Sequence, residues 1–338
     1  EAMGAPSGEL AQVRAEAVTA RRELKDPTAR IARTGQLGLV VLTVHRALKL
    51  VSELAGEEHF DKLVVDEAGM ISRAAAALMV PLAKSVLWAG DPLQLGPISQ
   101  AGAFAEGVQT GVRRWLRASP MSHLSDASRD ALRPDVLLLR AQHRMHPDIS
   151  KVVSHFAYEG MLEDAEGPMT REHRRVPAPF PDVRAGWVVL DRSLGDGQHV
   201  HAERGPRGRG YLREASGALA LELAAPAIAS GLTVLALTPY RAQAEWLKRE
   251  GAARRFSPDA FTASTVHSQQ GTEADLVLVD TVNAGRPFHA SDLTSMLNVA
   301  ASRAREYLFV LSSRAEAHAQ VPWRLRERLQ PPLVDAKG

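Results

Sequence analysis

Short apolar runs alternate with segments of helical periodicity along most of this chain. The apolar runs predict buried strands at residues 38–45, 63–66, 86–89, 136–140, 187–190, 233–237, 261–266, 276–280 and 307–311. The segments between them predict helices at residues 46–54, 73–79, 147–156, 212–228, 241–249 and 291–301, with a helical tail to about residue 329. Strands that alternate with helices are typical of parallel sheets with crossover helices. The pattern therefore predicts an α/β fold.

The alternation occurs twice, and a mixed stretch with turn residues from Ser119 to Pro134 separates the two series. A length of 338 residues is typical of two domains. We expect a helical linker or stub at residues 1–37, with a helix from Glu9 to Leu24. A first α/β domain then covers residues 38–132, and a second one covers residues 133–338.

Composition narrows the function classes only slightly. The chain is 45% hydrophobic and 24% charged, as in an ordinary globular protein, and its net charge of +2 does not single out nucleic acid as a partner. The absence of cysteine excludes disulfides, iron–sulfur clusters and thiolate zinc sites. No apolar run is long enough for a membrane span. We expect a cytoplasmic protein, and the high alanine and arginine content suggests a bacterial source.

Carboxylates follow two successive apolar runs of the first series. Asp66 and Glu67 end the run at 63–66, and the next run is followed by Gly90, Asp91 and, three residues on, Gln94. Ligands of open parallel sheets bind at the carboxyl ends of the strands. A nucleoside triphosphatase needs a metal-holding aspartate, a water-activating glutamate and a group that senses the terminal phosphate at such a rim. The alternative is that these residues are solvated turn residues.

Two arginine-bearing segments stand in the second series. Arg144 lies in the run Gln142-His-Arg-Met-His-Pro147, and Arg303 and Arg305 follow Asn298 near the end of a predicted helix. A guanidinium binds phosphate bidentately and stays charged. An arginine supplied to a transferring phosphate is worth on the order of 10³–10⁵ in rate. The alternatives are a basic strand end and surface arginines that cover an amphipathic helix.

Polar turns follow two other strands of the second series. One runs from Thr265 to Asp275 and contains glycine, which suits contact with a nucleotide or phosphate. The other begins at Thr238 and opens a helix whose first amides could bind an anion, although plain capping explains it equally. A glycine-flanked basic cluster could also contact a nucleic-acid strand or remain a solvated loop. Its members are Arg204, Arg207, Arg209 and Arg213.

Taken in this order, the motifs resemble those of superfamily 1 helicases of the 5′-to-3′ class, the group that includes the nonsense-mediated-decay helicase. The resemblance covers about residues 38–315. It is carried by Asp66-Glu67-Ala68 (motif II), Gly90-Asp91 with Gln94 to Pro97 (motif III), Gln142 with Arg144 to Pro147, Thr238-Pro239-Tyr240 with Gln243, Gln270-Gly271 with Glu273 and Asp275 (motif V), and Leu297 to Ala300 with Arg303 and Arg305 (motif VI).

The resemblance implies two RecA-like P-loop NTPase domains with parallel sheets, the first of them incomplete, that use ATP and Mg²⁺. Asp66 would hold the metal, Glu67 would polarise the attacking water, and Gln94 would couple the γ-phosphate to domain closure. Arg144 and Arg303 would be the arginine fingers. The nucleotide contacts would come from Gly90, Asp91, Gln142, His143, Gln270, Gly271, Glu273, which matches a ribose contact, and Arg305.

The implied partner is a single-stranded nucleic acid, with DNA ranked before RNA although no residue distinguishes them. The matching residues of the track are Thr43, Pro97, Thr238, Pro239, Tyr240, Thr265 and His267. The implied activity is ATP-dependent translocation or unwinding. Departures from the family pattern affect the base pocket most: Pro92, Gln269 and Thr272 replace usual residues, and His143 stands where a tyrosine is usual.

One family element is absent from the printed sequence. It contains no G-x-x-x-x-G-K-[ST] loop, whose backbone amides and lysine cradle the β- and γ-phosphates. We expect the chain to be a C-terminal portion of a longer helicase, inactive alone and completed by an upstream segment or a protein partner. The alternative is a catalytically incomplete module that binds nucleic acid or protein.

Overall fold

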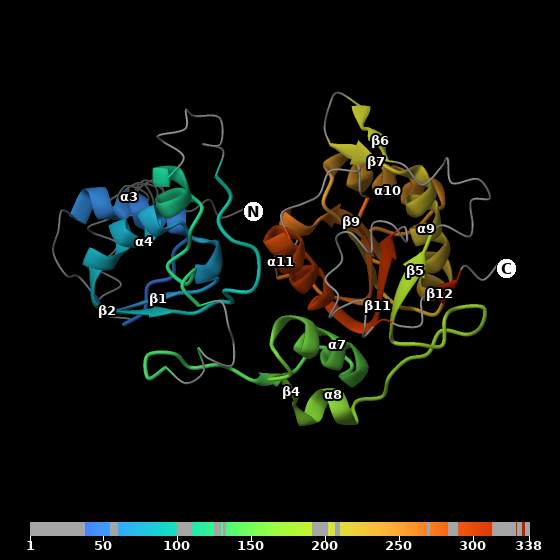
Figure 1. The fold of residues 1–338 in the computed structure, drawn as a ribbon, viewed down its shortest axis with the longest axis horizontal. Helices are drawn as coiled ribbons and strands as arrows, with labels where there is room; N and C mark the ends of the chain where they lie inside the picture. Colours follow the sequence, from blue (N-terminus) through green and yellow to red (C-terminus); the bar gives the residue numbers. More distant parts are fainter. Residues whose placement is uncertain are drawn as a thin grey trace, which may run out of the picture. The chain divides into compact units, whose positions relative to one another are not determined.

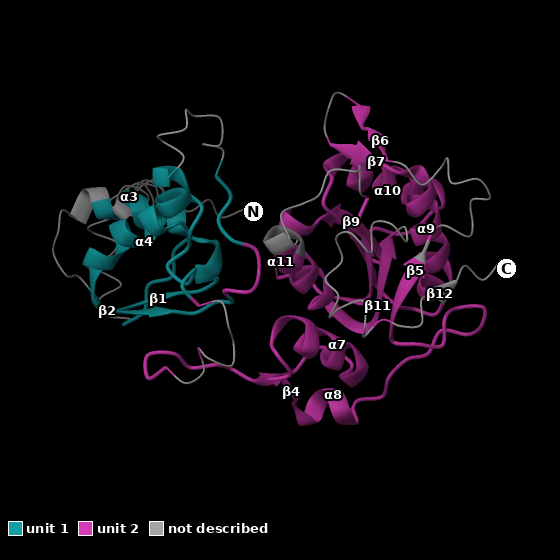
Figure 2. Ribbon diagram, viewed as in Figure 1, with its two compact units in different colours: residues 1–91, 96–123 teal, residues 92–95, 124–338 magenta. Residues whose placement is uncertain are grey.

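The computed structural model describes residues 38–54, 60–99, 110–124, 130, 133–190, 202–206, 210–268, 271–282, 290–312, 329 and 333–334. The predicted helices at residues 9–24 and in the tail, and most of the loop around 195–210, lie outside these residues. The chain divides into two compact units (Figure 2). Unit 1 comprises residues 1–91 and 96–123, and unit 2 comprises residues 92–95 and 124–338. No helix within the described ranges is long and apolar enough to cross a membrane.

Unit 1 is built on two parallel strands, β1 (Phe60–Val65) and β2 (Ala83–Trp88), with Val65 opposite Trp88. The short helices η1 (Ala68–Met70), α4 (Arg73–Met79) and η2 (Val80–Leu82) connect them, and α3 (Val44–Leu54) precedes them. A π-helical turn, η4 (Val112–Leu116), follows. The predicted helix 73–79 and its N-cap are confirmed, because the Ser72 hydroxyl accepts a hydrogen bond from the Ala75 amide at 3.2 Å.

The strand predicted at residues 38–45 is wrong. Residues 38–43 form neither helix nor strand, and α3 already begins at Val44. Leu39 and Val41 are 73% and 83% exposed. An apolar run becomes a buried strand only where a neighbouring strand pairs with it, and β1 and β2 form a sheet of two among the described strands.

Unit 2 contains a six-stranded sheet in the order β12-β5-β11-β10-β8-β9, in which every pair is parallel (Figure 1). Its strands are β5 (Ala185–Val189), β8 (Val234–Thr238), β9 (Phe261–Thr265), β10 (Ala274–Asp280), β11 (Ala304–Ser312) and β12 (Leu333–Val334). The strands predicted near these positions, apart from β12, are confirmed to within a few residues. This is the predicted α/β fold with a parallel sheet.

Helices cover both faces of this sheet. Helices α7 (Pro147–Ala157) and α11 (Ala290–Ala301) pack on one face, against Val277 and Val279. Helices α9 (Glu214–Ala229) and α10 (Arg241–Ala253) pack on the other, against Leu276 and Leu278. Alternate residues of β10 thus enter two different hydrophobic cores, which explains why this strand is apolar throughout.

Smaller elements complete unit 2. Two-residue strands β3 (Ala141–Gln142) and β4 (Glu163–Asp164) pair in parallel, and β6 (Glu203–Arg204) pairs with β7 (Tyr211–Leu212) in antiparallel orientation. Between β4 and β5 lies the short helix α8 (Glu166–Thr170). The strand predicted at 136–140 is wrong: its residues form no regular element and expose Leu137 and Leu139.

Arg213 does not belong to an exposed basic cluster, contrary to the prediction. Its side chain is completely buried and donates from Nη2 to Asp280 at 3.4 Å and from Nε to the Ser216 hydroxyl at 3.0 Å. Gln243 donates to Asp280 at 2.8 Å. A buried arginine needs such partners because an unpaired buried charge is very costly. Arg204 is exposed on β6, and Arg207 and Arg209 lie outside the described residues.

Candidate functional site

The carboxyl ends of β1 and β2 lie against one another in unit 1. The Ala68 amide donates to the Ala89 carbonyl at 2.8 Å, directly after the two strands. A Cβ on Gly90 would come within 2.8 Å of the Ala68 nitrogen, and one on Gly69 within 2.8 Å of the Asp91 carbonyl oxygen. The two turns therefore fit together only because both positions are glycine. This packing brings the Asp66-Glu67 and Gly90-Asp91 turns side by side.

Asp66 and Glu67 are both exposed at this rim. The Asp66 carboxylate accepts a hydrogen bond at Oδ1 from the Glu67 amide at 2.9 Å. Glu67 has φ 51° and ψ 40°, a left-handed conformation that is uncommon for residues other than glycine. Such conformations persist where the surroundings enforce them, and they cluster at functional sites. No sequence signal predicted this backbone geometry.

The chemistry of this rim fits a hard divalent cation. Among the described residues, no three histidine or acidic side chains group closely enough to form a complete metal cage. Mg²⁺ is usually held by one or two carboxylates together with phosphate oxygens and waters, so a single exposed aspartate suits it. Asp66 offers a carboxylate of this kind.

In unit 2, two of the predicted arginines converge on one carboxylate oxygen. Arg144 and Arg305 place their Nε atoms 2.9 Å and 3.2 Å from Oε2 of Glu273. The hydrogen bond from Arg305, together with the charge of Arg144, lowers the pKa of Glu273, while the same carboxylate raises the pKa of Arg305. Glu273 therefore stays ionised near neutral pH and holds two cations together.

A pocket of about 370 Å³ opens beside this group. Its lining residues are Gln142, His143, Arg144, Met145, Glu273 and Ser302. Arg144 is anchored within it because Nη1 donates to the Ser302 carbonyl at 2.8 Å. Five of the six lining residues come from the two segments that bear the predicted arginines, so the fold joins segments far apart in the sequence.

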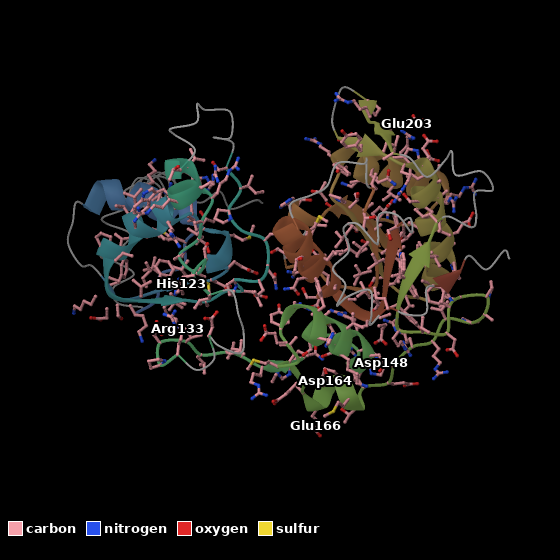
Figure 3. The ribbon with its side chains drawn as sticks, viewed as in Figure 1. His123, Arg133, Asp148, Asp164, Glu166 and Glu203 are labelled. Atoms are coloured by element: carbon pink, nitrogen blue, oxygen red, sulfur yellow. The ribbon has the colours of Figure 1, made fainter. Side chains whose placement is uncertain are left out.

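Both the oxygen and the nitrogen of the Gln142 side-chain amide form hydrogen bonds within the protein. Its Oε1 accepts from the amides of Arg144 and Met145, at 3.0 Å and 2.8 Å. Its Nε2 donates to the Met145 carbonyl at 3.0 Å and to Asp164 of β4 at 2.6 Å (Asp164 is labelled in Figure 3). These four bonds shape the loop that carries Arg144, which is a local reason for glutamine at this position.

Arg303 and Gln94 meet within unit 2. Arg303 is almost fully buried, donates from Nε to the Val299 carbonyl at 3.2 Å, and places Nη2 3.4 Å from Oε1 of Gln94. Asn298 donates to the Leu93 carbonyl at 3.2 Å, which attaches the segment 92–95 to α11. Gln94 thus lies in unit 2, although Gly90 and Asp91, which precede it in the same motif, lie in unit 1.

The residues expected along the nucleic-acid track make local contacts. Thr238 is buried, and its hydroxyl faces the Tyr240 amide at 3.4 Å. Thr43 lies just before α3, with Oγ1 3.4 Å from the Arg46 amide, and Thr265 contacts the Ser268 hydroxyl at 3.0 Å. Pro97, Pro239 and Tyr240 are half-buried, and His267 is exposed. Gly271 is exposed with φ +86°, and Gln270 lies outside the described residues.

Two residues that hold the arginine segments together were missed from the sequence. Arg171 donates from a single nitrogen, Nη2, to the carbonyls of Arg144 and Arg305, at 2.7 Å and 3.1 Å. Its Nε lies 3.5 Å from the buried carboxylate of Glu306. Arg171 is remote from both segments along the chain, so no local pattern marks it. Glu306 follows Arg305 on β11, where alternation places it on the opposite face.

A protein-family model described as an AAA domain matches residues 116–315, and a second one with the same description matches residues 5–145. The first match covers more than half of the chain. The chain belongs to the AAA domain family. Membership of this family implies the use of a nucleotide, typically together with a divalent metal.

The relatives of this AAA domain chain include proteins that are named as helicases. It is 25% identical over 274 residues to "Regulator of nonsense transcripts 1 homolog" from Arabidopsis thaliana, covering 78% of this chain and 20% of that protein. It is 27% identical over 266 residues to "5'-3' DNA helicase ZGRF1" from Mus musculus, covering 75% of this chain and 13% of that protein. These matches confirm the resemblance to superfamily 1 helicases. The chain spans at most a fifth of either relative.

One solved structure matches the chain with a low score. The C-terminal domain of a possible DNA helicase from Lactobacillus covers 57% of this chain and 97% of its own, at 13% identity and a TM-score of 0.35. A score of this size is below the range in which a shared fold can be inferred.

Proposed function

We propose that this chain carries the motor part of an ATP-dependent nucleic-acid helicase or translocase of the 5′-to-3′ class, which couples ATP hydrolysis to movement on single strands. The observation that carries the proposal is the convergence of Arg144 and Arg305 on Glu273 in a pocket, with Arg303 anchored beside Gln94. Several cations gathered at one edge suit a polyphosphate, because phosphoryl transfer depends mainly on positioning and charge stabilisation.

In this proposal the acidic rim of unit 1 handles the metal and the water. Asp66 holds Mg²⁺, which neutralises charge on the phosphates, and Glu67 polarises the attacking water. The exposure of both carboxylates supports these roles. Gly90 and Asp91 contribute to the same rim, where the two turns pack closely against one another.

The residues of unit 2 stabilise the transferred phosphate. Arg144 and Arg303 act as arginine fingers, and Gln94 senses the terminal phosphate. Arg144 is held by Glu273 and by the Ser302 carbonyl, so an incoming phosphate competes with Glu273 for this guanidinium. The remaining nucleotide contacts come from Gln142, through the loop it shapes, and from His143, Gln270, Gly271, Glu273 and Arg305.

Single strands then bind along residues that contact the backbone of the nucleic acid. Because Thr238 is buried and the Thr43 and Thr265 hydroxyls have local partners, we expect main-chain groups to make most of these contacts. Binding of this kind carries little sequence preference. The other track residues are Pro97, Pro239, Tyr240 and His267. DNA is favoured over RNA as the partner.

The test is ATP turnover in a chain extended upstream to include a phosphate-binding loop, with single-stranded DNA and RNA assayed in parallel. We expect stimulation by single strands and a loss on the order of 10³-fold in Arg144→Ala. The matched control is Arg249→Gln, an exposed arginine on α10 paired with its neighbour Glu250. Equal turnover in Arg144→Ala and the control would contradict the proposed role of Arg144.

The second candidate is a module that binds nucleic acid or a partner protein without catalysis. It predicts that the chain binds single strands with unchanged affinity when ATP and Mg²⁺ are added. It also predicts no turnover in the extended chain. Turnover stimulated by single strands would exclude it.

A further inference from the structure

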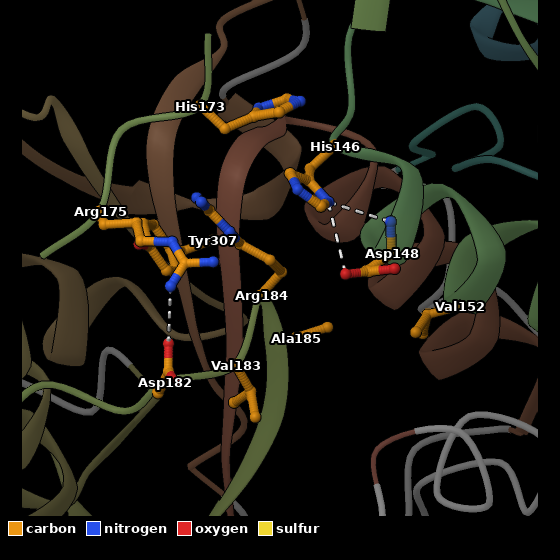
Figure 4. A pocket seen from close by; sticks show the side chains of 10 residues that line it. All are labelled: His146, Asp148, Val152, His173, Arg175, Asp182, Val183, Arg184, Ala185 and Tyr307. Atoms are coloured by element: carbon orange, nitrogen blue, oxygen red, sulfur yellow. Dashed lines mark hydrogen bonds and ion pairs between the residues drawn. The ribbon is translucent and has the colours of Figure 1, made fainter. Parts of the chain in front are cut away.

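A second cavity, of about 690 Å³, lies in unit 2 between His146, Arg175 and Arg184 (Figure 4). Its polar lining consists of His146, Asp148, His173, Arg175, Asp182 and Arg184. The cavity is bounded by the start of α7, the start of β5 and Tyr307 of β11. None of these side chains has a role in the proposed ATP chemistry.

A single buried carboxylate faces two guanidiniums and a histidine ring beside this cavity. Glu306, whose side chain is only 6% exposed, contacts His173 Nδ1 at 2.8 Å, Arg184 Nη1 at 3.1 Å and Arg171 Nε at 3.5 Å. We call these four residues the Glu306 cluster. Arg184 is 12% exposed, and its guanidinium lies over the Tyr307 ring, 4.5 Å from the centroid. Positive charge therefore exceeds negative charge in a poorly solvated region.

The two histidines differ in their hydrogen bonding. The ring of His173 has an acceptor at each nitrogen: Glu306 at Nδ1, and the Pro168 carbonyl at Nε2, 2.9 Å away. Both neighbours of the ring are therefore acceptors, so whichever ring nitrogen carries a proton has a partner. His146, whose ring centroid lies 4.2 Å away, instead accepts from the Asp148 amide at Nδ1. Its proton is therefore on Nε2, which makes it a donor.

The surroundings of His146 agree with this excess of positive charge. The pKa of His146 is lowered to about 4, first by burial and then by the neighbouring charges of His173, Arg184 and Arg171, which outweigh the opposing charge of Asp148. Asp148 and Asp182 are the other acids of the cavity, and both are well exposed, so water screens them. Arg175, at the edge, reaches Asp182 only at 3.9 Å.

We infer that this cavity binds a phosphate group, held by Arg184 and Arg175 with the Nε2–H of His146 as a further donor. Buried cations that outnumber their counter-ions are costly, and a bound anion removes that cost. Phosphate suits the site better than a carboxylate because it offers more acceptor oxygens to two guanidiniums and a ring N–H. The phosphate is either free inorganic phosphate or a backbone phosphate of a nucleic-acid strand.

This cavity is separate from the proposed nucleotide pocket, but hydrogen bonds to the backbone of Arg144 and Arg305 connect the two. The His146 amide donates to the Arg305 carbonyl at 2.7 Å, and Arg171 links the Glu306 cluster to the carbonyls of Arg144 and Arg305. Two lining residues of the cavity, His146 and Tyr307, thus lie two positions after Arg144 and Arg305 along the chain. The inference does not depend on ATP hydrolysis and stands if that activity is absent.

The test uses the ¹⁵N-labelled chain and follows the histidine ring resonances by NMR while inorganic phosphate is added at constant ionic strength. We expect saturable shifts of His146 and His173, with sodium chloride alone giving none. Arg184→Met, which keeps packing on Tyr307, is expected to weaken binding by about tenfold or more, as for loss of a charge-assisted hydrogen bond. Arg175→Gln, at an exposed position, is expected to weaken it less.

Arg249→Gln is the control, because it removes an exposed positive charge outside the cavity. A parallel titration with single-stranded oligothymidylate identifies the source of the phosphate. Competition between the oligonucleotide and inorganic phosphate indicates a backbone phosphate, and its absence indicates free phosphate. The proposal is overturned if phosphate gives no saturable shift, or if Arg184→Met and Arg175→Gln bind phosphate as tightly as the Arg249→Gln control.

Discussion

An aspartate stands at the carboxyl end of two apolar strand runs of this protein. The two runs are nearly the same, yet the two aspartates have opposite surroundings. Strand β1 leads into Asp66 after Leu63-Val-Val65, and β10 ends at Asp280 after Leu276-Val-Leu-Val279. Asp66 is exposed and bonds only locally to the Glu67 amide. Asp280 is buried among Arg213, Ser216 and Gln243. The run of residue types alone does not separate an exposed acid from a buried, structural one.

The difference follows from where each strand lies in its sheet. β10 has parallel neighbours on both sides and helices on both faces, so a charge at its end must be neutralised inside the protein. β1 pairs with β2 and with no other described strand, and Val64 near its carboxyl end remains exposed. Its terminal carboxylate is therefore left to water and to any ligand. Accessibility is what supports the proposed catalytic role of Asp66.

The largest expected effect comes from removing the buried charge. Asp280→Asn leaves Arg213 buried without its counter-ion, so we expect the free energy of unfolding of unit 2 to fall by about 3–5 kcal/mol. Denaturant unfolding monitored by tryptophan fluorescence measures this. The exposed Asp259→Asn is the control. A loss below about 1 kcal/mol in Asp280→Asn would show that the network is not structural, and the contrast with Asp66 would disappear.

The next effect concerns the packing that keeps the β1 and β2 ends together. Gly90→Ala places a Cβ 2.8 Å from the Ala68 nitrogen, and backbone cannot yield as a flexible side chain can. We expect unit 1 to lose about 1–3 kcal/mol of stability in thermal unfolding. Gly111→Ala is the matched control, because Gly111 is helical with open space around its Cβ, and it should stabilise by roughly 0.4–1 kcal/mol. Equal effects would contradict the proposed close fit.

The third expected effect is a dependence of the free energy of unfolding on pH, caused by His146 of unit 2. The pKa of His146 is about 4 in the folded protein and 6.5 in the unfolded chain, so the unfolded chain binds the extra proton between these values. The contribution of His146 to the free energy of unfolding is therefore greatest above about pH 6.5, and it is lost as the pH falls towards 4. The expected slope is up to about 1.4 kcal/mol per pH unit.

Urea unfolding in phosphate-free buffer between pH 7 and pH 4 measures this slope. His146→Asn keeps an acceptor for the Asp148 amide, because asparagine is also a good N-cap, but it cannot titrate. We expect its slope over this range to be shallower. His123→Asn, the same substitution at an exposed position, is the control. If His146→Asn retains the full slope, the pH dependence does not come from His146.

The smallest expected effect is the stability change on replacing Asp66. Because this carboxylate is exposed and accepts a single local hydrogen bond, Asp66→Asn should change the free energy of unfolding by no more than about 0.5 kcal/mol. Calorimetric unfolding of Asp66→Asn and of Asp280→Asn measures the difference between the two losses of stability directly. A loss of several kcal/mol in Asp66→Asn would assign it a structural role like that of Asp280.

The sequence predicted the parts of the fold that depend on local pattern. The Ser72 cap and the helix after it follow from residue types within one turn, and the strands of the large sheet follow from runs apolar on both faces. The same reasoning failed at residues 38–45 and 136–140. Those runs are equally apolar, but no described strand pairs with them over their length. The residues of a run do not show whether another strand will pair with it.

The site could be predicted only where motifs carry it. Arg144, Arg303 and Glu273 were found from their motifs, and the structure brings Arg144 to Glu273 and Arg303 to Gln94. Arg171 could not be found, because its partners are main-chain carbonyls remote in the sequence. The burial of Arg213 was missed for a related reason: an arginine beside glycines suggests a surface loop, and only the position of Asp280 reverses that interpretation.

The central claim is that the β1 end is a catalytic edge. The most direct measurement is single-strand-stimulated ATP hydrolysis in a chain extended upstream with a phosphate-binding loop, comparing Glu67→Gln with the exposed control Glu222→Gln. Glu67→Gln keeps the size of the side chain but removes the charge that would polarise water. We predict that turnover is lost in Glu67→Gln and retained in Glu222→Gln. Turnover in Glu67→Gln equal to that of the unsubstituted chain would contradict the claim.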